Sequence, residues 1–171
     1  MKQSLSRTSG QKRVFFTCAF LIGVASLALG VFTATQVNAD FKTVDGKEYR
    51  WQHLEGKWVV LNYFAKWCAP CLRELPELNR FADSVDEDVK LFGVNYDPMP
   101  TPEIQALIRE FKIQFPVIPN EVDNKLPTQT PGYLPATFII APNGDVAATL
   151  FGEQTEKGLH QKIQALKSQS L

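Results

Sequence analysis

Residues 58–71 read WVVLNYFAKWCAPC, and this stretch decides the fold. Its first seven residues form a continuous apolar run with β-branched members, which predicts a strand buried on both faces of a largely parallel sheet. Pro70 suits the first turn of a helix. Apolar residues follow at a period of about 3.6, namely Leu72, Leu75, Leu78 and Phe81. We therefore expect Cys68 and Cys71 where the strand ends and a helix begins.

Further regular elements follow along the chain. The apolar run 89–96 predicts a second strand, and a right-handed helical crossover would join it to the first in a βαβ unit. The hairpin signal Asn143-Gly144 separates two further apolar runs. Together with two amphipathic patterns, these signals predict a helix over 103–112, strands over 136–140 and 146–151, and a last helix over 155–166.

Two segments have less regular patterns. Residues 41–51 contain the turn signal Asp45-Gly46 between short stretches, which predicts a small β extension ahead of the main sheet. Residues 119–134 carry three prolines without periodicity, so we expect a long functional loop. The sequence thus predicts one α/β domain over residues 40–171, with a central mixed β-sheet, helices on both faces and an N-terminal β extension.

The first 39 residues differ from the rest. A basic stretch ends at Arg13, and residues 14–35 are nearly all apolar or small, which is long enough to enter a bilayer with the basic end cytoplasmic. Residues 1–39 are therefore expected to be a signal peptide cleaved near Ala39 or an N-terminal membrane anchor. We favour cleavage, because an anchored domain normally has a flexible tether and almost none separates the apolar run from the expected start of the domain. The domain is expected to be periplasmic or otherwise extracytoplasmic.

Charge excludes one class of partner. The chain has 18 basic and 18 acidic residues, and four of the basic ones but no acidic ones lie in residues 1–39, so the remainder carries 14 − 18 = −4. A mildly acidic domain without clustered Lys or Arg has no electrostatic footprint for nucleic acid. We expect no nucleic-acid partner.

Cys68 and Cys71 form a Cys-x-x-Cys motif with three interpretations. A zinc site needs four ligands, and residues 40–171 contain no other cysteine and only two histidines, so we expect no metal and no other cofactor. A purely structural disulfide closing so short a loop would stabilise the fold little. A redox pair fits best, because the positive end of the helix dipole favours the Cys68 thiolate. Cys68 is the predicted nucleophile, and the more shielded Cys71 is the resolving thiol.

Several motifs resemble those of the thioredoxin family. They are residues 66–71 after a buried strand, Pro76 in the next helix, and residues 134–137 before a hairpin. More narrowly, the chain is similar to the exported TlpA/ResA-like branch through Phe41, Asp45-Gly46-Lys47, Gly56-Lys57, Val59-Val60-Leu61-Asn62, Glu74-Leu75-Pro76 and Phe115-Pro116-Val117. The resemblance covers nearly all of residues 41–171 and implies the thioredoxin fold.

The resemblance also implies further site residues. Pro135 is expected to be cis, to lie against the cysteine pair and to present the backbone of Leu134 to a substrate strand. Trp67 is expected to pack beside the thiols, with a plain core aromatic as the alternative. Thioredoxins proper carry a buried aspartate under the pair where this chain has Asn62, which cannot exchange a proton.

Glu74 is the candidate for that proton-exchanging group. It lies three residues after Cys71, hence on the same helix face, and it matches a glutamate that the ResA-like branch places beside its thiols. A solvated helix glutamate is an equally weighted alternative. For Lys66 and Arg73 we prefer a solvated role, because exposed charges are screened.

The predicted function is that of an exported thiol-disulfide oxidoreductase, a reductase of disulfides in exported proteins. The dipeptide Ala69-Pro70 lacks a basic group, so Cys68 should be less acidic than in strongly oxidising relatives. A membrane dithiol electron donor would be required, and the resemblance implies cytochrome c haem-site or copper-site thiols as substrates. The alternatives are a disulfide oxidase or isomerase, or a non-catalytic binding or metal-delivery module.

Overall fold

The computed structural model describes residues 39–169, and residues 1–38, with the predicted signal or anchor, lie outside them. The elements are β1 (Phe41–Lys42), β2 (Glu48–Tyr49), η1 (Trp51–His53), β3 (Trp58–Phe64), α2 (Ala69–Ser84), β4 (Val89–Asn95), α3 (Thr101–Glu110), β5 (Val117–Ile118), β6 (Ala136–Ile140), β7 (Val146–Phe151) and α4 (Glu156–Gln169). All the predicted helices and strands are present. Within this part of the chain, no helix is both long and apolar enough to span a membrane.

Five strands form one mixed sheet in the order β5-β4-β3-β6-β7. Strand β4 is parallel to β3 and β5, whereas β6 is antiparallel to β3 and β7. Every residue of β3 is buried, because a central strand packs side chains on both of its faces. The predicted central mixed sheet is therefore confirmed. Strands β1 and β2 form the predicted N-terminal extension as a separate antiparallel pair.

The three α-helices contribute to one core cluster on one face of the sheet. This cluster joins Val60, Leu91 and Ile139 of the sheet to Leu75, Leu78 and Phe81 of α2, Ile104 and Leu107 of α3, and Leu159 and Ile163 of α4. The chain moves from β3 to β4 to β5 in one direction, and right-handed crossovers then place successive helices on the same face. This corrects the prediction of helices on both faces: within residues 39–169 the three α-helices cover one face, and the other carries the short 3-10 helix η1.

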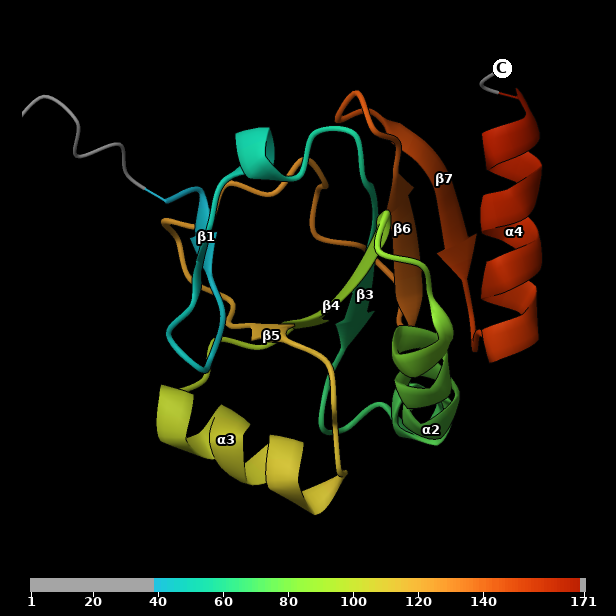
Figure 1. Cartoon of the computed structure of the whole chain (residues 1–171). Helices are drawn as coiled ribbons and strands as arrows, with labels where there is room; N and C mark the ends of the chain where they lie inside the picture. The colour runs from blue at the N-terminus through green and yellow to red at the C-terminus, as the bar shows by residue number, and fades with distance from the viewer. Residues whose placement is uncertain (1–38, 170–171) are drawn as a thin grey trace, which may run out of the picture. The chain divides into compact units, whose positions relative to one another are not determined.

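Shorter segments cover the other face, where the β1–β2 pair, η1 and the loop 119–134 lie. Phe41 stacks on Tyr49 with ring centroids 5.2 Å apart, and it meets Phe92 of β4 edge-on at 5.4 Å. Leu126 of the loop packs against the same apolar cluster. In Figure 1, β4 and β5 pass between β1 and α3. The N-terminal extension therefore occupies the position of a second helical layer.

Strand β5 is the strand that the sequence analysis did not predict. Its two residues are too few for a periodic pattern, and the pairing with Gly93–Val94 of β4 defines the strand. A Cβ at Gly93 would lie 2.9 Å from a ring carbon of Phe115 and 3.0 Å from one of Phe64. Glycine is therefore the residue that lets these two rings close over β4.

Candidate redox site

The junction between β3 and α2 positions the two cysteines. Cys68 is the N-cap residue of α2, with extended backbone angles of φ −89° and ψ 90°. Its Sγ accepts a hydrogen bond from the Cys71 N–H at 3.3 Å, and Pro70 lies in the first turn. The sulfur of Cys68 thus faces the unpaired N–H groups of the helix start, which favour a thiolate there. The predicted placement at a strand-to-helix junction is confirmed.

Cys68 and Cys71 form a disulfide, with their Cα atoms 5.3 Å apart. Cys68 is 4% exposed and Cys71 is fully buried at 0%. Cys68 is thus the slightly more accessible of the two sulfurs, and its role as nucleophile, with Cys71 as resolving thiol, stays a prediction. Residues 39–169 contain no cluster of three or more His, Cys, Asp or Glu side chains arranged to hold a metal.

The peptide bond between Leu134 and Pro135 is cis, as predicted. Strand β6 begins directly afterwards, and its Ala136 pairs with Tyr63 near the end of β3. Leu134 is half-buried and packs against the core cluster that contains both cysteines. The cis bond therefore lies at the same end of the sheet as the disulfide.

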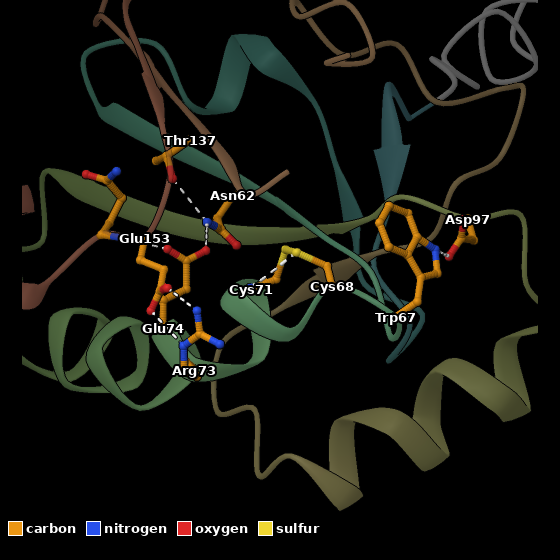
Figure 2. The surroundings of a disulfide bond; sticks show 10 residues. Asn62, Trp67, Cys68, Cys71, Arg73, Glu74, Asp97, Thr137 and Glu153 are labelled. Carbon is orange, nitrogen blue, oxygen red and sulfur yellow. Dashed lines mark hydrogen bonds and ion pairs between the residues drawn. A yellow bond between two sulfur atoms is a disulfide. The ribbon is translucent and has the colours of Figure 1, made fainter. Parts of the chain in front are cut away.

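Glu74 lies in a buried polar network rather than in solvent. The residue is 1% exposed. Its Oε1 accepts a hydrogen bond from Asn62 Nδ2 at 2.8 Å, and its Oε2 accepts one from the Gln154 N–H at 2.7 Å. Asn62 Nδ2 also donates to Thr137 Oγ1 at 3.0 Å. Figure 2 shows Glu74, Asn62 and Thr137 of this network beside the disulfide. The solvated alternative for Glu74 is therefore wrong.

Burial changes the acidity of Glu74. It raises the pKa of this carboxyl from 4.5 to about 7, because the charged form loses its solvation. The hydrogen bonds from Gln154 and Asn62 lower the pKa in part, and the nearby charge of Glu153 raises it further. Glu74 therefore exchanges its proton near neutral pH, a property that Asn62 lacks. The Gln154 contact had no sequence signal, because it joins residues 80 positions apart.

The alternative that Trp67 is a plain core aromatic is wrong. Its side chain is 66% exposed, and its Nε1–H donates to Asp97 Oδ2 at 2.9 Å. The ring of Tyr96 meets it edge-on at 6.2 Å. In Figure 2 the Trp67–Asp97 pair and the Glu74 network lie on opposite sides of the disulfide. The indole is thus held beside Cys68 by an interaction that sequence analysis missed.

Two charged residues near the cysteines differ in their contacts. Arg73, on α2, forms an ion pair with Glu153, whose chain neighbour Gln154 binds Glu74. The side chains of Arg73 and Glu153 are 62% and 42% exposed, so the pair contributes little stability. Lys66 is exposed, in agreement with its predicted solvated role.

Comparison with known proteins agrees with this geometry. A family model described as AhpC/TSA family matches residues 32–149. The chain is 28% identical over 170 residues to thiol-disulfide oxidoreductase ResA of Geobacillus kaustophilus, a match that covers 92% of this chain and 97% of that protein. The predicted ResA-like resemblance is confirmed.

Solved structures show the same fold. StoA from Bacillus subtilis aligns with a TM-score of 0.62 and 24% identity, over 71% of this chain and 92% of StoA. The pneumococcal exposed lipoprotein thioredoxin Etrx1 from Streptococcus pneumoniae aligns with a TM-score of 0.65 and 23% identity, over 73% of this chain and 96% of Etrx1. These likenesses confirm the predicted thioredoxin fold.

Proposed function

The chain belongs to the AhpC/TSA family and is a thiol-disulfide oxidoreductase, and we propose that it reduces disulfide bonds in exported proteins through Cys68 and Cys71. The observation that carries the proposal is the disulfide at the N-terminus of α2, next to a buried carboxyl group. A helix start lowers the pKa of a cysteine thiol. A buried carboxyl that titrates near neutral pH suits proton transfer.

The proposed reaction has two exchange steps. The Cys68 thiolate attacks one sulfur of the substrate disulfide, so that a mixed disulfide forms, the substrate S–S bond breaks and the leaving substrate sulfur takes up a proton. The Cys71 thiol then loses its proton, and its sulfur attacks Cys68 Sγ and releases the second substrate sulfur as a thiol. The substrate gains two electrons and two protons. The chain is left with the Cys68–Cys71 disulfide, which a dithiol donor must reduce.

Glu74 is the proposed acceptor for the Cys71 proton. Cys71 is fully buried, so bulk water does not reach its thiol. Glu74 follows three residues later on the same helix, and its pKa of about 7 lies close to neutral pH. A general base is most effective under that condition. Leu134, Pro135 and Trp67 are the proposed contacts for the substrate around Cys68.

We place the domain, residues 40–171, outside the cytoplasm, with residues 1–39 as signal peptide or anchor. The basic start and the apolar run over 14–35 support export. The similarity to Etrx1, named an exposed lipoprotein, is consistent with it. The proposed partners are exported proteins with disulfides, among them cytochrome c or copper-site precursors, and a membrane dithiol donor.

Trapping tests the proposal. Reduced wild-type protein is expected to reduce insulin disulfides, and Cys68→Ser to be inactive. Cys71→Ser should accumulate a mixed disulfide with its substrate, because the resolving thiol is missing. A reduction potential near the oxidising extreme of about −120 mV would instead identify an oxidase. Absence of turnover by the wild type would favour the non-catalytic binding module.

A further inference from the structure

Several of the exposed apolar side chains are aromatic. Within residues 39–169, five large apolar side chains are exposed, and three of them, Trp67, Tyr133 and Phe151, lie beside the cysteines or the cis-proline loop. Tyr133 is 79% exposed and Phe151 is 61% exposed. Their rings meet edge-on with centroids 6.4 Å apart. We call these two residues the aromatic pair.

The cis-proline loop fixes the position of the aromatic pair. Tyr133 lies two residues before Pro135, and Phe151 pairs with Ala136 in the β6–β7 register. The N–H of Gly152 donates to the carbonyl oxygen of Pro135 at 3.0 Å. Both rings are thus attached to backbone that flanks the cis bond, one on each side of it in the chain.

The aromatic pair does not contribute to the hydrophobic core. Neither ring belongs to the two buried clusters of the domain, and contiguous exposed apolar surface on a soluble protein marks an interaction site. The nearest charges along the chain belong to Glu153, whose carboxylate is paired with Arg73. The carboxylate two residues after Phe151 is therefore neutralised by its partner, which suits an uncharged apolar group at Phe151.

We propose that the aromatic pair is a subsite for an aromatic or branched apolar side chain of an extended polypeptide, within two residues of the cysteine that exchanges with Cys68. The proposal rests on the proposed function. In an extended chain, side chains two residues apart point the same way and are about 7 Å apart. The cis bond lies at the same end of the sheet as the disulfide, so a substrate whose cysteine meets Cys68 would bring its neighbouring side chains toward the two rings.

Matched peptides test the subsite. Each peptide carries one cysteine in a mixed disulfide with thionitrobenzoate, flanked by serines. In each member of the set, a single phenylalanine replaces one serine at one of the two positions before or the two positions after the cysteine, and one control peptide keeps serine throughout. The rate at which reduced protein, in excess over the peptide, releases thionitrobenzoate in a single turnover gives a second-order rate constant for each peptide. We expect wild type to prefer the best phenylalanine peptide over the all-serine peptide by about tenfold, which corresponds to about 1.4 kcal/mol.

The double variant Tyr133→Ser/Phe151→Ser is expected to reduce this preference to about twofold or less. Because the preference is a ratio measured within one variant, a change in cysteine reactivity cancels. Val146→Ser is the matched control, since Val146 is another exposed apolar residue of β7, and it should keep the wild-type ratio. Melting temperatures of the three proteins establish that they are folded.

The outcomes separate the two proposals. A wild type that reduces every phenylalanine peptide at the same rate as the all-serine peptide, or a double variant that keeps the tenfold ratio, would overturn the subsite and leave the reductase proposal intact. A wild type that reacts with neither the peptides nor a small aromatic disulfide would overturn the proposed function itself, and the subsite with it.

Discussion

Replacing Glu74 by glutamine should abolish a large pH dependence of stability. The folded-state pKa of about 7 lies above the ordinary value of 4.5, so the folded protein holds this proton more tightly than the unfolded chain. Stability from this group is fully present below the unfolded pKa and is lost as pH rises through the folded pKa. This rise in pKa corresponds to about 3 kcal/mol in the free energy of unfolding, of which about 2.5 kcal/mol is lost between about pH 5 and about pH 8.

Glutamine keeps the size of Glu74 but does not ionise. Its amide offers one acceptor oxygen where the carboxylate accepts from both Asn62 and Gln154, so we expect a pH-independent cost of about 1 kcal/mol. Glu74→Gln should therefore be slightly less stable than wild type near about pH 5 and about 1 to 2 kcal/mol more stable near about pH 8.

Urea unfolding of the oxidised protein at several pH values measures this difference. The matched control is Glu110→Gln, because Glu110 is an exposed glutamate of α3, and it should follow the wild-type profile. If Glu74→Gln shows the same pH dependence as wild type, the assignment of a raised pKa to Glu74 is wrong, and so is its proposed role as proton acceptor.

Three further substitutions probe other contacts. Asn62→Asp places a second carboxyl group beside Glu74 and removes a donor, so the pH at which stability falls should change in titrations followed by circular dichroism. Gly93→Ala should destabilise by about 1 to 3 kcal/mol in urea unfolding, because its Cβ would overlap the Phe115 ring. Leu78→Ala should lower stability by about 2 to 5 kcal/mol in thermal unfolding, since Leu78 is fully buried; a smaller loss would mean that the core closes around the cavity.

Local sequence patterns predicted the helices and strands but not which face of the sheet the helices cover. The apolar runs of β3 and β4 and the periodic residues of α2 are short-range signals, and each predicted its element. Which face a helix covers depends on the order of the strands, and β5 is too short to show a pattern. The predicted second layer of helices failed for that reason, and the β1–β2 extension covers that face.

At the redox site, too, some features follow from local sequence and others only from tertiary contacts. The sequence by itself determined that Cys68 and Cys71 lie at a strand-to-helix junction, because strand and helix periodicity and the capping preferences of a helix start are local properties. Only the tertiary structure decided that Glu74 is buried, that Trp67 is held by Asp97 and that Tyr133 lies against Phe151. These contacts join residues 30 or 80 positions apart for Trp67 and Glu74, and burial and acidity depend on such neighbours rather than on adjacent residues.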